Sequence, residues 1–227
     1  MAGDGTSGGS YTGDVEVGGP PDVRELPGLT ITKLAVSDMA NNAYLLRDPA
    51  SGEALLVDAA AEPQALLALI GDADLRTVVT THGHWDHHRA LPDVVRASGA
   101  LTVAHPADAD DLPVPVQREV QHGDTVTVGG QSLEVVHLRG HTPGSIALVW
   151  RGPADAGVHV FTGDSLFPGG VGNTQQDAAR FASLIDDVEE RLFDVLPDDA
   201  WVYPGHGKDT TIGTERPHLA EWRARGW

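Results

Sequence analysis

The chain contains no cysteine among its 227 residues. This absence excludes a fold held by disulfides, an iron–sulfur cluster, a cysteine nucleophile and any metal site built on thiolates. A metal ion in this protein must therefore be held by nitrogen and oxygen ligands.

Positive charge is also scarce. Lysine and arginine together number 15 against 33 aspartates and glutamates, which gives a formal net charge of −18. Such a charge repels a phosphate backbone unless a local basic patch overrides it. The nearest approach to a patch is a group of three arginines interrupted by two acids: Arg216, Arg223 and Arg225, with Glu215 just before the group and Glu221 within it. We therefore expect no nucleic-acid partner.

Long apolar runs are missing as well. The longest are comparable to Ala65–Ile70, whereas a membrane-spanning helix needs about 18 apolar residues. Residues 1–28 are rich in Gly, Ser, Asp and Pro and lack the apolar stretch of a secretory signal. We expect no membrane partner, a cytoplasmic location, a flexible N-terminal tail over residues 1–28 and one folded domain over residues 29–227.

Several common catalytic motifs are absent too. No Gly-x-Gly-x-x-Gly segment follows a strand and opens a helix, and no Walker-type lysine loop occurs. A Gly-x-Ser-x-Gly elbow is also missing, so a serine-hydrolase triad has no anchor. The sequence thus gives no sign of a nucleotide cofactor or of a serine nucleophile.

Apolar periodicity and turn signals predict an α/β protein. Helices are expected at 62–71, 86–98, 177–196 and 215–223, and strands at 30–36, 43–47, 54–58, 77–80, 101–104, 124–128, 132–138, 145–151, 158–162 and 201–203. Hairpin turns are too frequent for a sheet built only from βαβ units. We therefore expect two sheets packed between helices.

The most informative segment is Thr80–His88, which reads Thr-Thr-His-Gly-His-Trp-Asp-His-His. It follows a predicted strand, so His82, His84 and Asp86 would project to one side with a period of two residues. His87 leaves that line where the next helix is expected to start. One short segment can in this way supply ligands to two metal ions.

Three further candidate ligands each follow an apolar strand in a glycine-containing loop. They are His141 in Gly140–Ser145, Asp164 in Phe161–Ser165, and His206 in Tyr203–Gly207. Glycine allows the backbone to turn closely, and loops at strand ends commonly carry functional side chains. Four such loops predict one shared site.

In the order and content of these motifs, residues 29–213 resemble the metallo-β-lactamase-fold hydrolases, and within them the glyoxalase II-like (hydroxyacyl-thiol hydrolase) branch. The resemblance implies a four-layer αββα sandwich as the catalytic domain. It also implies that His82, His84 and His141 hold metal 1, that Asp86, His87 and His206 hold metal 2, and that Asp164 bridges the two. Imidazole and carboxylate ligands favour zinc, with iron or manganese as alternatives.

The activity that this resemblance implies is hydrolysis of a small thioester by a metal-bound hydroxide, with Asp86 accepting a proton. Two ions about 3.5–4 Å apart can lower the pKa of a shared water toward 7 and polarise a carbonyl. A thiolate leaves without a strong acid because the pKa of a thiol is only about 8.5. Three residues beside the ligand loops are candidate substrate contacts: Trp85, Phe167 and Lys208.

Two other activities on this fold remain open. Persulfide dioxygenases use a single iron, whose ligands would correspond here to His82, His141 and Asp164. Their loop after the aspartate reads Gly-Arg-Thr-Asp-Phe, whereas this chain has Gly172–Gln176, Gly-Asn-Thr-Gln-Gln. Lactonase activity is the second. Glyoxalase II enzymes also carry a C-terminal helical domain that contacts glutathione, and only 21 residues follow His206 here.

Overall fold

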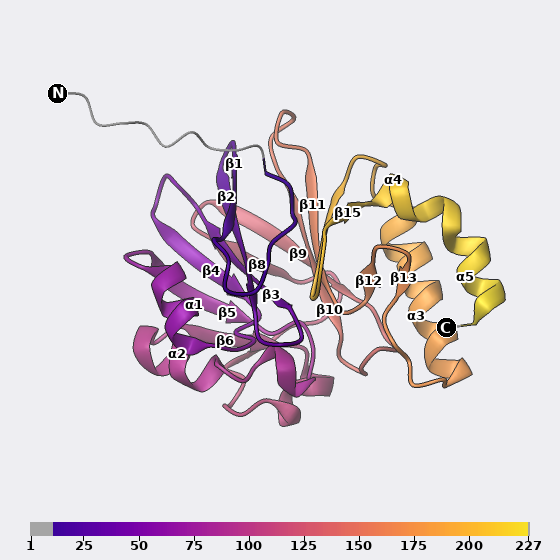
Figure 1. Ribbon diagram of the computed structural model, residues 1–227, viewed down its shortest axis with the longest axis horizontal. Coiled ribbons are helices and arrows are strands. Elements are labelled where there is room, and N and C mark those ends of the chain that lie inside the picture. Colours follow the sequence, from indigo (N-terminus) through magenta and orange to yellow (C-terminus); the bar gives the residue numbers. More distant parts are fainter. Residues whose placement is uncertain (1–10, 227) are drawn as a thin grey trace.

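The computed structural model describes residues 11–226. Its two main sheets lie between two layers of helices (Figure 1). The first sheet has seven strands in sequence order: β1 (Asp22–Leu26), β2 (Leu29–Val36), β3 (Asn41–Arg47), β4 (Glu53–Val57), β5 (Asp74–Val79), β6 (Leu101–Ala104) and β7 (Arg118–Glu119). Strands β1 to β4 pair antiparallel, and β4 to β7 pair parallel.

The second sheet has the order β15-β14-β11-β10-β9-β8. Only the β11–β14 pair is parallel. Its strands are β8 (Thr125–Val128), β9 (Gln131–His137), β10 (Ile146–Arg151), β11 (Val158–Gly163), β14 (Trp201–Pro204) and β15 (Thr210–Thr211). A separate small hairpin is formed by β12 (Leu166–Phe167) and β13 (Gly170–Val171).

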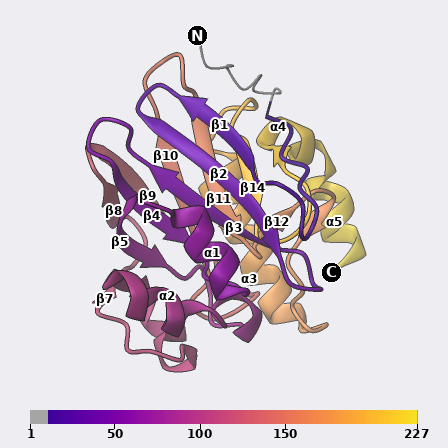
Figure 2. The ribbon, with the colours of Figure 1, turned by 60° about the vertical axis from the view of Figure 1, so that its left-hand side comes forward.

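Helices cover the outer faces of both sheets. In Figures 1 and 2, α1 (Pro63–Ile70) and α2 (Leu91–Ser98) lie on the first sheet, and α3 (Ala178–Val188) and α5 (Leu219–Arg225) lie on the second. Shorter helical segments are η1 (Trp85–His87), η2 (Pro106–Asp111), η3 (Glu189–Phe193), α4 (Ile212–Glu215) and η4 (Arg216–His218). No helix within residues 11–226 is long and apolar enough to cross a membrane.

Apolar side chains on alternate residues of each inner strand build three separate cores. On β10, Ile146, Leu148 and Trp150 face the other sheet, whereas Ala147 and Val149 face the helix layer. Because both faces are buried, such a strand reads as an almost continuous apolar run. The predicted four-layer αββα sandwich is thereby confirmed.

Two predicted helices differ from the observed ones. The helix expected at 86–98 is a single 3₁₀ turn over Trp85–His87 followed by α2 from Leu91, because Pro92 sets the start of the regular helix. The helix expected at 177–196 is regular only to Val188 and then widens into the π-helical turn η3. The first difference leaves Asp86 and His87 in an irregular turn rather than in a straight helix.

The structure also starts the fold before Leu29. Strand β1 pairs with β2 inside the range expected to be a tail, and the Tyr11 ring lies 6.0 Å from that of Trp201. Buried Lys33 donates to the Gly13 carbonyl at 2.6 Å, which ties this segment to the sheet. A composition rich in glycine and proline does not reveal such long-range contacts. Residues 1–10 of the expected tail lie outside the described residues.

Candidate metal centre

The segment after β5 places four of the predicted ligands together. His82 and His87 are fully buried, Asp86 is 6% exposed and His84 is half-buried. Asp86 and His87 are consecutive buried residues of the η1 turn. The rings of His82 and His84 lie 4.9 Å apart between centroids, and those of His82 and His87 4.2 Å apart.

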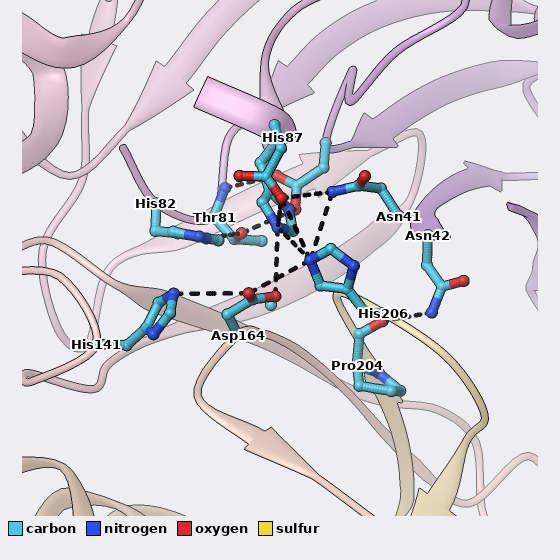
Figure 3. A network of polar contacts seen from close by, with 12 residues as sticks. Asn41, Asn42, Thr81, His82, His87, His141, Asp164, Pro204 and His206 are labelled. Carbon is cyan, nitrogen blue, oxygen red and sulfur yellow. Dashed lines mark hydrogen bonds and ion pairs between the residues drawn. The ribbon is translucent and has the colours of Figure 1, made fainter. Parts of the chain in front are cut away.

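The other three predicted ligands come from the second sheet. His141 follows β9, Asp164 follows β11 and His206 follows β14. Figure 3 shows these side chains pointing toward His82 and His87. The Asp164 Oδ2 atom lies 3.5 Å from Nε2 of His141 and 3.5 Å from Nε2 of His206. Asp164 thus stands between the two predicted metal positions.

The ligand atoms form three groups in which all atoms lie within 4.8 Å of one another: His82, His84 and His141; His82, His87 and Asp164; and Asp86, His87 and His206. The first and third groups are those predicted for metal 1 and metal 2. The second group joins the two through Asp164. All seven predicted ligand residues are therefore brought into one cluster.

Hydrogen bonds at Nδ1 fix the orientation of four of the histidines. His141 donates to the Asn173 carbonyl at 2.9 Å and His206 to the Met39 carbonyl at 2.9 Å, because a carbonyl can only accept. His87 donates to Asp58 Oδ2 at 2.9 Å. Each ring then presents an Nε2 lone pair to the centre when it is neutral.

His82 is oriented through one more residue. The Thr81 hydroxyl donates to Asp58 Oδ2 at 2.8 Å, so its oxygen accepts from Nδ1 of His82 at 3.0 Å. Asp58 is buried and also accepts the Thr81 backbone N–H at 2.8 Å. A single carboxylate therefore orients one histidine of each predicted metal position.

The electrostatic environment differs between the two positions. Burial lowers the pKa of His82 and lowers that of His141 to about 4. Burial also disfavours the charged forms of His87 and His206, but neighbouring carboxylates outweigh this effect. They are Asp164 and Asp58 at His87, and Asp164 and Asp86 at His206. The pKa of His87 is raised to about 10 and that of His206 to about 9.

The two carboxylates of the cluster are held ionised. Burial disfavours the charged form of both carboxyls, but their neighbours outweigh this effect. At Asp86 these neighbours are His206, His87 and Asn41. At Asp164 they are chiefly His87 and His206. The pKa of each carboxyl lies below its ordinary value.

These groups fit divalent cations. Nε2 of His82, Nε2 of His141 and Oδ1 of Asp164 are buried and make no hydrogen bond. Nε2 of His87 lies 3.1 Å from Nε2 of His206, a contact between two lone pairs unless a proton or a cation stands there. A cluster of buried acceptors with so few donors is stabilised by metal ions that accept nitrogen and oxygen ligands.

Two glycines allow the loops to approach this closely. A Cβ added at Gly205 would overlap Asp164 Oδ1 and lie 2.8 Å from Cε1 of His87. A Cβ added at Gly172 would overlap the Asp164 carbonyl and lie 3.0 Å from Nδ1 of His141. Any side chain at either position would push Asp164 out of place.

Residues not identified from the sequence support the cluster. Asp58 directly follows β4, just as Asp164 directly follows β11. Its place at the end of a buried strand is the sequence signal by which Asp58 could have been found. Asn41 donates to Asp86 Oδ2 at 2.9 Å. Asp108, in η2, accepts the backbone N–H of Gly83 at 2.8 Å and that of Gly144 at 2.7 Å, and it also accepts the Thr142 hydroxyl. Asp108 therefore joins the loop of His82 and His84 to the loop of His141.

The three predicted substrate contacts have different surroundings. Trp85 is 58% exposed, and the Arg89 guanidinium lies 4.6 Å from its ring centroid. The Phe167 ring is partly buried and lies 6.4 Å from the ring of His206. Lys208 is exposed and forms an ion pair with Asp14 at 2.7 Å. Of the three, Phe167 is the one whose ring faces a candidate ligand in the described part of the chain, and all three remain predictions.

Comparison with known proteins gives a consistent result. The model of the metallo-beta-lactamase superfamily matches residues 36–206. The chain is 30% identical over 208 residues to hydroxyacylglutathione hydrolase GloC of Haemophilus influenzae. The matched region covers 83% of this chain and 95% of that relative.

Two solved structures are also similar. ETHE1 from Myxococcus xanthus has a TM-score of 0.73 and 31% identity, with 86% of this chain and 84% of that chain covered. TTHA1623 in a di-iron-bound form has a TM-score of 0.65 and 32% identity, with 81% and 96% covered.

Proposed function

This chain belongs to the metallo-beta-lactamase superfamily of metal-dependent hydrolases, and we propose that it is a dinuclear thioesterase of the glyoxalase II type. The observation that carries the proposal is the convergence of four oriented imidazoles, with their Nε2 atoms inward, on Asp86 and Asp164. The likeness to a hydroxyacylglutathione hydrolase over most of both chains supports the thioester as substrate.

In this proposal His82, His84 and His141 hold one ion, and Asp86, His87 and His206 hold the other. Asp164 is shared. When bound, such ions would supply an activated water at neutral pH and would polarise the substrate carbonyl. Zinc suits the nitrogen and oxygen ligands, and the di-iron form of TTHA1623 keeps iron as an alternative.

The chain's own residues orient the ligands and move a proton. Asp58 and the backbone carbonyls of Met39 and Asn173 hold the imidazoles in the tautomer that leaves Nε2 free. Asp86 is ionised, and Asn41 fixes its Oδ2 atom at 2.9 Å. Asp86 can therefore accept the proton that the attacking water loses.

The leaving group sets the preference for thioesters over amides. A thiolate departs without protonation because the pKa of a thiol is about 8.5, whereas an amine must be protonated as it leaves. Asp86 and Asp164 are ionised before the reaction, so the one proton that either carboxyl could pass to an amine is the proton that Asp86 takes from the attacking water. This chemistry favours a hydroxyacyl thioester.

One observation favours a second candidate, a persulfide dioxygenase with a single iron. The buried ligand atoms that make no hydrogen bond are on His82, His141 and Asp164, the three residues that such an iron would use. The Gly172–Gln176 loop lacks the arginine of the dioxygenase pattern. We therefore rank this activity second, and a lactonase third.

One set of assays separates these functions. The protein is purified without chelator, its metal content is measured, and it is given an S-lactoyl thioester, a homoserine lactone and a glutathione persulfide under air. We expect two ions per chain and turnover of the thioester. Oxygen consumption with the persulfide, together with a single bound iron, would show that the protein is a persulfide dioxygenase and not a thioesterase. Turnover of the lactone alone would show that it is a lactonase.

A further inference from the structure

A groove of about 800 Å³ lies beside the candidate metal centre. It is lined by Val171, Gly172, Asn173, Thr174, Gln176 and Gly226. The Asn173 carbonyl accepts the hydrogen bond of His141 at 2.9 Å, and Gly172 lies against both His141 and Asp164. The wall of this groove is therefore the segment that supports two of the candidate ligands.

The side chains that line the groove are uncharged. Asn173, Thr174 and Gln176 offer amide and hydroxyl groups, and Asn173 and Gln176 are exposed. Within residues 11–226 the Gln176 carboxamide has no hydrogen-bond partner, and the Nδ2 group of Asn173 likewise has none. These groups are thus available to a ligand that donates and accepts hydrogen bonds.

The backbone presents these amides at a conformational cost. Gln175 and Gln176 have φ of 57° and 60°, in the left-handed region that favours glycine. Two successive non-glycine residues in that region are strained, and such strain persists where surrounding contacts hold it in place. Asn173 Oδ1 accepts the Gln175 backbone N–H at 2.7 Å, and the Asp177 cap of α3 follows directly.

Two arginines close in sequence to the segments that line this groove are engaged by the protein. Arg180 donates through Nε to the Gly140 carbonyl at 2.8 Å and through Nη1 to Gln175 Oε1 at 3.1 Å, and it also donates to the His141 carbonyl. Arg225 contacts the Gly169 carbonyl at 3.2 Å and Glu221 at 3.9 Å. The chain as a whole carries a net charge of −18. A carboxylate in the groove would lose water without gaining a cationic partner among the residues that line it.

We propose that this groove binds the thiol half of the substrate, and that it selects thiols whose body is uncharged and carries amide or hydroxyl groups. The inference rests on the proposed thioesterase function. It narrows the substrate from thioesters in general to those of neutral thiols, and it assigns the recognition to Asn173 and Gln176. A thiol with two carboxylates, such as glutathione, is then a poor substrate.

The test compares two thioesters with the same acyl group on the zinc-loaded protein. S-lactoyl-pantetheine has an uncharged thiol with two amides and two hydroxyls, and S-lactoylglutathione has two carboxylates. We expect kcat/KM for the pantetheine ester to be higher by about tenfold or more. Gln176→Arg should raise kcat/KM for the glutathione ester and reverse or flatten this ratio, and Gln176→Glu should increase it.

The matched control is Gln121→Arg, at an exposed glutamine that is not part of the groove. It should leave the ratio unchanged. Preference of the wild type for the glutathione ester, or a ratio unmoved by Gln176→Arg, would overturn the inference.

A binding measurement separates this inference from the proposed function. The non-hydrolysable thioethers S-methylpantetheine and S-methylglutathione are titrated into the zinc-loaded protein by calorimetry. Tighter binding of S-methylpantetheine, with the preference lost in Gln176→Arg and unchanged in Gln121→Arg, supports the groove proposal. If neither thioester is turned over, the thioesterase proposal alone ends and this binding result still stands. Equal binding of both thioethers in every variant would end the groove proposal.

Discussion

The two halves of the molecule supply the candidate ligands in different ways. The first sheet delivers four within the segment from His82 to His87, and the second sheet delivers His141, Asp164 and His206 one at a time from three strand ends. The supports differ as well. In the first half, Asp58 orients His87 directly and His82 through Thr81. In the second half, His141 and His206 donate to backbone carbonyls. A point mutation can remove the first kind of support but not the second.

The largest expected effect comes from the residue shared by both predicted metal positions. Asp164→Ala removes the carboxylate that lies 3.5 Å from both His141 and His206. We expect the variant to bind fewer than two ions per chain and to lose activity by about three orders of magnitude or more, because both metal-assisted steps need the pair. Metal analysis and thioester turnover measure this. Wild-type turnover by a folded variant would refute the bridging role.

The next effect tests the support of the first half. Asp58→Asn keeps the size of the side chain but removes the charge that orients His87 directly and His82 through Thr81. Loss of such a partner typically weakens metal affinity by about 10- to 100-fold. Competition with a chromophoric chelator measures the affinity. The control is Asp72→Asn, at an exposed aspartate, and equal affinities of the two variants would contradict this role.

The link between the halves is expected to matter for stability. Asp108→Ala leaves the backbone N–H groups of Gly83 and Gly144 without an acceptor, and the Thr142 hydroxyl keeps only its contact with Ser145 Oγ at 2.6 Å. Because each unsatisfied buried donor costs about 1–3 kcal/mol, the free energy of unfolding should fall by roughly 3 kcal/mol or more. Urea unfolding of the metal-free protein measures it, with exposed Asp110→Ala as control. A loss no greater than that of the control would show that Asp108 does not hold the loops together.

How far these features could be predicted from the sequence depends on how local their causes are. The alternation along β10 and the spacing of His82, His84, Asp86 and His87 are local, so the sandwich and the candidate ligands followed from pattern and resemblance. Asp58 and Asp108 are single aspartates whose partners are distant in sequence, and an isolated aspartate after a strand is more often a turn residue. The packing of Tyr11 against the second sheet likewise depends on contacts that no local pattern encodes.

A smaller effect is expected from acid in the second half. His159 is buried between the Tyr203 hydroxyl and the Ala156 carbonyl, and burial lowers its pKa to about 4. The pKa of His159 in the folded protein lies below its unfolded value of about 6.5. The contribution of neutral His159 to the free energy of unfolding is therefore fully present above pH 6.5 and is lost as the pH falls toward 4.

Between pH 7 and pH 5 the metal-free wild type should therefore lose about 2 kcal/mol more unfolding free energy than His159→Gln, which does not titrate. Urea unfolding at both pH values gives the difference. Parallel losses in the two proteins would mean that His159 does not make the second half acid-sensitive.

The smallest effect concerns Lys208, two residues after His206, which the sequence suggested as a substrate contact. Its ammonium group is exposed and pairs with Asp14, in contrast to Lys33, which is buried and donates to the Gly207 carbonyl at 2.7 Å. Exposed pairs of this kind contribute little, and a neutral thiol offers Lys208 no carboxylate, so Lys208→Ala should change KM for S-lactoyl-pantetheine by less than about twofold. The same measurement with S-lactoylglutathione decides whether Lys208 is a substrate contact or only an exposed partner of Asp14. A large rise in KM for that ester alone would make Lys208 a carboxylate contact, and would show that the loop of His206 recognises charge where the groove of the second half does not.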